Sequence, residues 1–143
     1  MHNNDTELAA LLGEVKTIAV LGAKDAPGQA VDIVGRYLIS AGYRVIPVHP
    51  KRTGVWGLTT YQSLADIPEA VDLVDVFRAA EACPAHAAET LRLQPRPRCF
   101  WMQSGIASAE ARKILAGSGI LVVEDSCLMV DHRNLLAAGG PHG

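Results

Sequence analysis

Two basic side chains, Lys51 and Arg52, follow the segment Arg44–Val48, which is apolar enough for a buried strand. In a nucleotide-binding sheet the end of the second strand faces the ribose, and chains that bind NAD usually carry an Asp or Glu there. A carboxylate would repel a phosphate on that ribose, whereas ammonium and guanidinium groups attract one through charge-assisted hydrogen bonds. The pattern therefore favours a nucleotide with a ribose phosphate, and the alternative is a solvated Lys–Arg pair.

A glycine-bearing loop precedes this region. The apolar segment Thr17–Leu21 leads into the loop Gly22–Gly28, and a helical pattern follows. Because the first turn of a helix leaves backbone N–H groups without partners, such a loop can bind a diphosphate. The glycine spacing matches neither GxGxxG nor a P-loop, so two ordinary turn glycines are the alternative. The candidate diphosphate contacts are Gly22, Ala23, Lys24, Gly28 and Gln29.

The ends of three strands carry further candidate contacts. The Arg78 guanidinium can steady a diphosphate or simply extend into solvent. A pliable Met with a neighbouring amide suits a flat adenine or a thin pantetheine arm, although Met102 fits core packing equally well. Two coenzymes that carry a phosphate on the adenosine ribose are NADP and coenzyme A. The candidates are His49, Phe77, Arg78, Met102, Gln103 and Ser104.

Apolar segments of strand length alternate with helical patterns along the chain. The expected strands are Thr17–Leu21, Arg44–Val48, Val71–Phe77, Cys99–Met102 and Ile120–Val123. The expected helices are Glu7–Leu12, Gln29–Ala41, Pro84 to about Leu93, and Ala109–Ala116, the last capped by Ser108. Because parallel crossovers are right-handed, this order predicts an α/β, Rossmann-like, doubly wound and mainly parallel five-stranded sheet with helices on both faces. All the candidate loops then meet at the carboxyl ends of the strands.

Composition narrows the class of protein further. The 143 residues suit a single domain over 1–143, with a leading helix within 1–14 and an irregular tail over 135–143. The net charge of −2 gives no basic footprint, so we expect no nucleic-acid partner. We expect a cytoplasmic protein, because no signal peptide or membrane span is evident. The three cysteines are widely spaced, which favours unpaired thiols, and no metal-ligand spacing is present.

Several motifs in one order resemble the CoA-binding domain family of small bacterial proteins. The matching segments are Ile18–Gly22, Gly42–Pro50, Tyr61–Pro68, Val71–Arg78, Trp101–Ile106 and Asp125–His132. The resemblance implies the fold of the N-terminal nucleotide domain of the succinyl-CoA synthetase α subunit. It implies coenzyme A lying across the loops, with the diphosphate at Gly22–Gln29 and the adenosine phosphate near Lys51. The strand-four loop, Met102 to Ser104, would meet the adenine or the arm. Ala23-Lys24 stands where the family often has Ser or Thr, His49 where Asn is common, and Ser104 where Leu is frequent.

No convincing catalytic group accompanies these loops. Cys127 and His132 are five residues apart, but a thiol just past an apolar strand is more often buried and inert. The synthetase's phosphorylated histidine belongs to a second domain that has no counterpart in this sequence. We therefore expect a non-catalytic module that binds coenzyme A or acyl-CoA as a carrier, sensor or regulatory partner. It would be a monomer or homodimer, with an unidentified protein partner possible. The alternatives are an NADP-binding oxidoreductase or redox sensor, and an interaction domain whose crevice stays empty.

Overall fold

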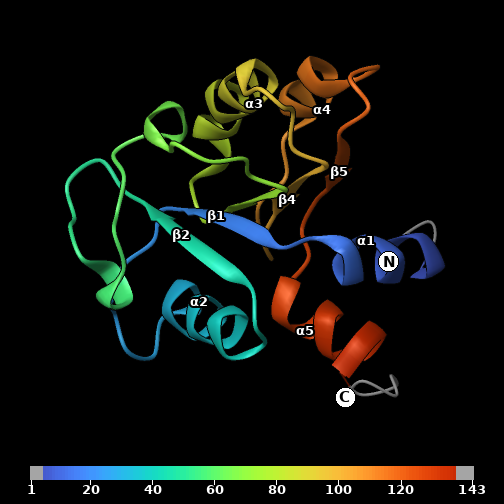
Figure 1. The fold of residues 1–143 in the computed structure, drawn as a ribbon. Coiled ribbons are helices and arrows are strands. Elements are labelled where there is room, and N and C mark those ends of the chain that lie inside the picture. Colours follow the sequence, from blue (N-terminus) through green and yellow to red (C-terminus); the bar gives the residue numbers. More distant parts are fainter. Residues whose placement is uncertain (1–4, 138–143) are drawn as a thin grey trace.

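The computed structural model describes residues 5–137, and five parallel strands form its centre (Figure 1). The spatial order of the strands is β2-β1-β3-β4-β5, so the order reverses beside β1. Their bounds are β1 Thr17–Leu21, β2 Arg44–Val48, β3 Leu73–Val76, β4 Cys99–Met102 and β5 Leu121–Val123. The α/β, doubly wound fold expected from the sequence is confirmed, and the sheet is parallel throughout.

The strand β3 is shorter than the predicted strand Val71–Phe77. Backbone hydrogen bonds still join Asp72 N to Thr17 O and Phe77 N to Leu21 O, so the pairing with β1 extends slightly beyond the strand. The Asp72 carboxylate also accepts hydrogen bonds from the backbone N–H groups of Lys16 and Thr17, each at 2.9 Å. This side chain therefore fixes where the chain enters β1.

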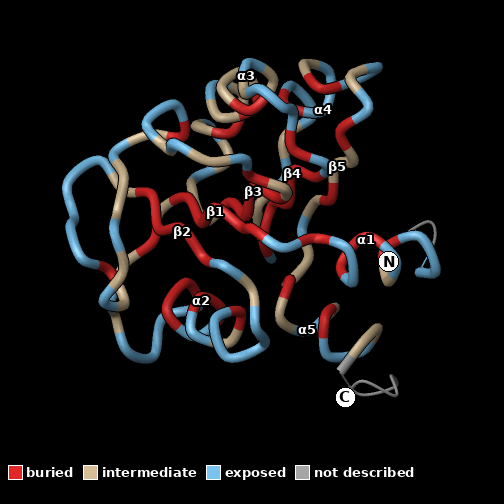
Figure 2. Tube along the Cα trace, in the orientation of Figure 1, coloured by how far each residue is buried: buried red, intermediate tan, exposed pale blue. Residues whose placement is uncertain are grey.

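Helices cover both faces of the sheet (Figure 1). Alternate residues of each strand point to opposite faces: Ile18 and Trp101 pack beneath α1, α2 and α5, whereas Ala19 and Phe100 pack beneath α3 and α4. Figure 2 shows β1, β3 and β4 buried along their length, β5 half-buried at its start, and the helices buried mainly where they face the sheet. The bounds are α1 Asp5–Glu14, α2 Ala30–Ser40, α3 Cys83–Arg92, α4 Ala109–Leu115 and α5 Leu128–His132.

Capping residues mark the ends of two helices, α2 and α4. The predicted helix Gln29–Ala41 is observed as α2, Ala30–Ser40. The two predicted end residues, Gln29 and Ala41, are its N-cap and C-cap. Ser108 Oγ accepts a hydrogen bond from Ala111 N at 3.0 Å, which confirms the predicted cap of α4. In contrast, α1 runs through Gly13, beyond the predicted Glu7–Leu12.

The sequence pattern did not reveal α5. This helix continues as a π-helical turn over Arg133–Ala137, so residues 135–137 of the predicted irregular tail are helical. The remainder of that tail, 138–143, and residues 1–4 of the leading segment lie outside the described residues. The Tyr37 hydroxyl and His132 Nδ1 are hydrogen-bonded at 2.6 Å, and Leu135 and Leu136 pack against the core. Tertiary packing rather than local periodicity therefore holds this short helix.

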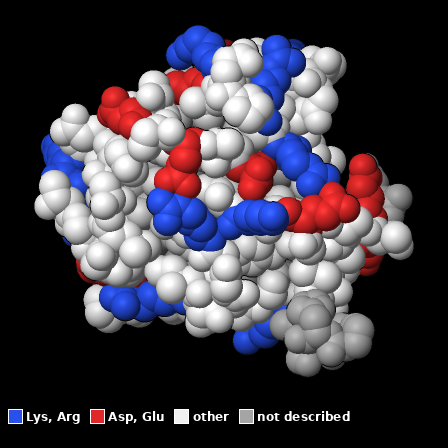
Figure 3. Space-filling model, in the orientation of Figure 1, with Lys and Arg blue, Asp and Glu red and all other residues white. Residues whose placement is uncertain are grey.

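The surface carries mixed charge. On the face shown in Figure 3, acidic and basic side chains are interleaved. Exposed ion pairs such as Arg44–Glu69 and Arg98–Glu14 join neighbouring segments. Within residues 5–137, no helix has both the length and the hydropathy to cross a bilayer.

Asp75 lies in the centre of the sheet and is fully buried. Its Oδ1 accepts a hydrogen bond from Gln103 Nε2, but its Oδ2 has no partner within the described part of the chain. Burial raises the pKa of this carboxyl to about 7, and the Gln103 hydrogen bond opposes the shift. The unfolded chain releases this proton near pH 4, so folding stability falls as the pH rises from about 4 to about 7.

Replacing Asp75 with Asn should remove this pH dependence. Asn keeps the acceptor for Gln103 and carries no charge, so the variant should exceed the wild type in unfolding free energy by about 2 kcal/mol at about pH 8. Most of that advantage should disappear at about pH 5, where wild-type Asp75 is protonated. Urea unfolding at both pH values measures the difference. Parallel pH profiles for the two proteins would contradict a neutral buried Asp75.

Candidate functional site

A cavity of about 420 Å³ opens at the carboxyl ends of the strands, beside β1 where the strand order reverses. We call it the crevice. Six predicted contacts line it: Gly22, Lys24, Gln29, His49, Phe77 and Arg78. Four further lining residues were not predicted: Ala30, Val31, Ala79 and Ile106. Ala30 and Val31 begin α2, and their backbone N–H groups have no partner inside the helix, so the crevice contains the donors expected for an anion.

The other predicted contacts lie outside the crevice lining. Ala23 is buried in the core, and its N–H donates to Val48 O at 3.3 Å. Gly28 and Ser104 are exposed. Met102 is fully buried against the face covered by α3 and α4, which leaves it no surface for a ligand. Gln103 is also buried and is engaged with Asp75.

Lys51 and Arg52 are exposed but act on a residue of the crevice. His49 Nδ1 accepts hydrogen bonds from the backbone N–H groups of Lys51, at 3.0 Å, and Arg52, at 3.2 Å. Burial lowers the pKa of His49, and the charges of Arg52, Arg78, Lys24 and Lys51 lower it further. Lys24 and Arg78 line the crevice beside His49, and Lys51 and Arg52 follow it in the same turn, so positive charge gathers near this imidazole.

Arg78 joins the crevice to a second cavity of about 190 Å³, which we call the side pocket. Both cavities are lined by Gly22 and Arg78, and the side pocket adds Pro50, Gln62, Ser63 and the pair His86–Glu89. The His86 Nδ1 lies 2.8 Å from Glu89 Oε1. The sequence carries a His three residues before a Glu near the start of α3, but this pattern does not indicate a pocket, because its nearness to β2 depends on the tertiary fold.

The guanidinium of Arg78 is incompletely satisfied. Its Nε is buried and has no hydrogen-bond partner among residues 5–137. Leaving a buried donor unpaired costs about 1–3 kcal/mol, more when the group is charged. A guanidinium that lines two cavities and keeps an unsatisfied donor is suited to an anionic ligand.

Gly22 is required by a close approach of two backbones. A Cβ at this position would lie 2.3 Å from the carbonyl oxygen of Phe77, and the residue adopts a φ of +82°. The Gly22 N–H donates to Val48 O at 3.0 Å, so the ends of β1, β2 and β3 meet here. The glycine therefore serves the geometry of the switch point as well as any ligand.

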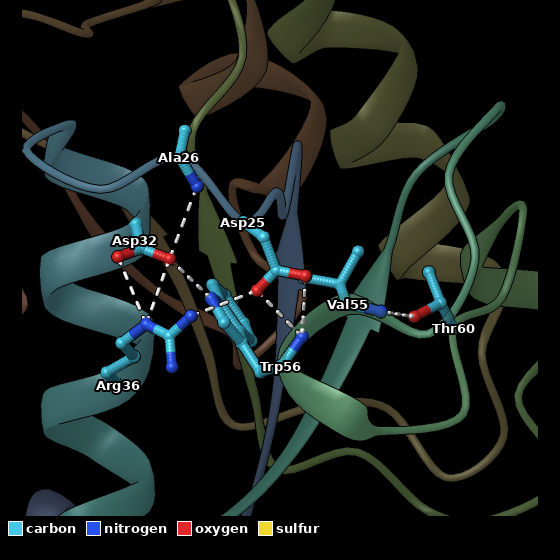
Figure 4. Close-up of polar contacts among 7 residues, drawn as sticks. All are labelled: Asp25, Ala26, Asp32, Arg36, Val55, Trp56 and Thr60. Atoms are coloured by element: carbon cyan, nitrogen blue, oxygen red, sulfur yellow. Dashed lines mark hydrogen bonds and ion pairs between the residues drawn. The ribbon is translucent and has the colours of Figure 1, made fainter.

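A polar cluster joins the loop after β1 to the loop after β2 (Figure 4). Asp25, in the loop after β1, accepts hydrogen bonds from Trp56 N at 3.0 and 3.1 Å. Trp56 Nε1 donates to Asp32 on α2 at 2.9 Å, and this hydrogen bond, with that of Arg36, lowers the pKa of Asp32 against the effect of burial. Trp56 adopts a φ of 55°, and its ring occupies the space that a Cβ on Gly35 would need. The cluster fixes both loops relative to α2.

Other parts of the molecule offer weaker candidates. A cavity of about 570 Å³ lies at the amino ends of the strands, but the Tyr43 hydroxyl that borders it already donates to Leu12 O. His132 is bonded to Tyr37, and Cys127 is half-buried at the start of α5. Within the described residues, no group of three His, Cys, Asp or Glu side chains is placed to bind a metal ion. The cavities at the carboxyl ends of the strands are therefore the candidate site.

The chain matches known proteins along most of its length. Residues 16–133 match the family described as a CoA binding domain. The chain is 35% identical over 126 residues to the uncharacterized protein YneT of Bacillus subtilis, covering 88% of this chain and 92% of that protein. A solved structure from Thermus thermophilus is 47% identical with a TM-score of 0.87, covering 93% and 99% of the two chains. A structure of the dinucleotide-forming acetyl-coenzyme A synthetase 1 of Ca. Korarchaeum cryptofilum is 21% identical, with a TM-score of 0.63. The match covers 75% of this chain and 25% of that chain, and it shows likeness of fold alone.

Two glycines of the same loop provide a matched test of the switch point. Gly22→Ala should destabilise the protein by roughly 3 kcal/mol or more, because the new Cβ meets the Phe77 carbonyl and the φ is positive. Gly28 also has a positive φ, of +89°, but a Cβ there has open space. Gly28→Ala should therefore cost only about 1 kcal/mol. Urea unfolding measures both changes, and equal losses would remove the special role of the contact with Phe77.

Proposed function

Because the chain belongs to the family of CoA-binding domains, we propose that it binds coenzyme A or a short acyl-CoA across the crevice and the side pocket. In this proposal the protein is a non-catalytic module that acts as a carrier, sensor or regulatory partner. The observation that carries it is Arg78, which lines both cavities and whose buried Nε has no hydrogen-bond partner among residues 5–137. A diphosphate is the part of the coenzyme that supplies acceptors for such a donor.

The charges around the site support one orientation of the coenzyme. Lys51 and Arg52 directly follow Pro50, and Pro50 lines the side pocket. A phosphate on the adenosine ribose would be held by these two cations, so the base would enter the side pocket. His86, Glu89, Gln62 and Ser63 supply the polar groups there. This differs from the expectation that the strand-four loop meets the adenine, because Met102 and Gln103 are buried.

The crevice would receive the rest of the coenzyme. The first turn of α2 and Lys24 would face the diphosphate together with Arg78. Apolar surface from Val31, Phe77 and Ile106 would then lie along the pantetheine arm. The two cavities together fall within the range of about 300–1,000 Å³ that ligand pockets occupy.

A binding role without catalysis agrees with the reactive groups near the site. Nucleophilic catalysis needs an activated group within hydrogen-bond reach of a base. The pair His86–Glu89 in the side pocket is an imidazole beside a carboxylate, and in this proposal it serves as a polar contact for the ligand. Burial raises the pKa of Cys83, with smaller contributions from Glu124 and Glu81, and a raised pKa disfavours the thiolate. His49 is the imidazole that borders the crevice, and its Nδ1 is occupied by backbone N–H groups.

Comparing coenzyme A with dephospho-CoA tests the role of the two cations. Wild-type protein should bind coenzyme A about tenfold more tightly, because the extra phosphate gains charge-assisted hydrogen bonds. The double variant Lys51→Ala/Arg52→Ala should lose most of this preference. Isothermal titration calorimetry measures all four affinities, and Lys113→Ala on α4 serves as a control for the loss of a surface cation.

Three outcomes would contradict parts of the proposal. Equal affinity of the wild type for the two coenzymes would remove the role of Lys51 and Arg52. Tighter binding of NADPH than of coenzyme A would favour the NADP-binding alternative. An unchanged melting temperature with every nucleotide would indicate an empty crevice, because a ligand of the native state must raise it.

A further inference from the structure

His49 combines two contacts that constrain its protonation. Its Nδ1 lies 3.0 Å from the backbone nitrogen of Lys51 and 3.2 Å from that of Arg52, and both nitrogens donate to it. A ring nitrogen can accept only while it carries no proton. The neutral ring must therefore have its proton on Nε2.

This geometry makes His49 the acceptor of a tight turn. Asn and Asp side chains hold such turns by accepting backbone N–H groups two or three residues further along the chain. Nδ1 of a histidine lies at the same distance along the side chain as Oδ1 of an asparagine. His49 thus performs the same task over the segment that ends in Lys51 and Arg52, with an acceptor that, unlike an amide, can take up a proton, although burial and the nearby cations lower its pKa.

We propose that His49 is a positioning residue: its neutral Nδ1 holds the turn that presents Lys51 and Arg52 to the ligand, and its protonation releases the turn and weakens binding. This inference rests on the proposed function, because the ligand is the phosphate-bearing coenzyme assigned above. It adds a pH response to that site and assigns His49 a role that acts through the two neighbouring cations.

Two electrostatic effects compete when the pH falls. Lys24 from the loop after β1, Arg78 after β3, and Lys51 and Arg52 from the same turn all disfavour the imidazolium, and burial does so more strongly. A bound anion would favour the imidazolium, which alone would tighten binding in acid. However, a proton on Nδ1 would point at two N–H donors, so the charged ring cannot keep its place in the turn. The loss of the turn should therefore outweigh the added charge.

Asn and Ala variants separate these effects. His49→Asn keeps a turn acceptor and removes the titration, whereas His49→Ala removes both. Between about pH 7.5 and an acid pH at which the ring ¹⁵N signals show His49 protonated, the wild type should lose about tenfold more affinity for coenzyme A than His49→Asn does. His49→Ala should bind more weakly than His49→Asn at about pH 7.5, with no larger pH dependence than that variant. The ligand's own phosphate also titrates in this range, and the comparison cancels that contribution because the ligand is the same.

Calorimetry at the two pH values measures these ratios. Equal ratios for the wild type and His49→Asn would overturn the proposal. So would tighter wild-type binding in acid, because the imidazolium would then act as a phosphate-binding cation.

Nuclear magnetic resonance of the ligand-free protein tests the turn without any ligand. The ¹⁵N shifts of the His49 ring should show the proton on Nε2, and the amide signals of Lys51 and Arg52 should move as His49 titrates. A proton on Nδ1 at neutral pH would overturn the proposal even if coenzyme A binds. If coenzyme A fails to bind at about pH 7.5, the proposed function is wrong, and so is the proposed weakening of its binding in acid. These spectra still decide whether His49 holds the turn.

Discussion

The close contact between Gly22 and the carbonyl oxygen of Phe77 is the constraint on which the rest of the structure depends. Because the strand order reverses beside β1, the connections that follow two neighbouring strands must leave the sheet in opposite directions at one point. The missing side chain of Gly22 lets these backbones approach, and the Val48 carbonyl accepts the N–H groups of Gly22 and Ala23. The crevice and the side pocket both form around this glycine. Fold and site therefore share one steric requirement.

The loops around the crevice are also tied to one another. Asp25 from the first loop binds the backbone of Trp56 from the second, and both contact α2 through Asp32 and Arg36 (Figure 4). A ligand that pulls on one loop would thus meet resistance from the other. Such preorganisation reduces the entropy that binding must remove. The cations of the second loop can therefore act on a ligand held mainly by the first.

The sequence predicted the parts of the fold that local patterns determine. β1, β2 and β4 have the predicted bounds because continuous apolar runs end at glycine or polar residues. The short α5 was missed because contacts with distant helices, such as that of His132 with Tyr37, hold it. The site was predicted loop by loop, but sequence cannot tell whether a strand-end side chain faces the cavity or the core. Met102 is an example, because the structure places it in the core. The turn made by His49 likewise depends on a rotamer that residue type alone does not give.

The packing of α1 has a consequence for how the chain is made. Leu8, Leu11 and Leu12 belong to the same core cluster that Leu135 and Leu136 pack against. On a ribosome, the first helix emerges long before the residues that complete its cover. The part of its apolar face that contacts Arg133–Ala137 therefore stays uncovered until translation has passed that turn. Vectorial synthesis thus leaves the last part of this core cluster open until nearly all of the described chain has left the exit tunnel.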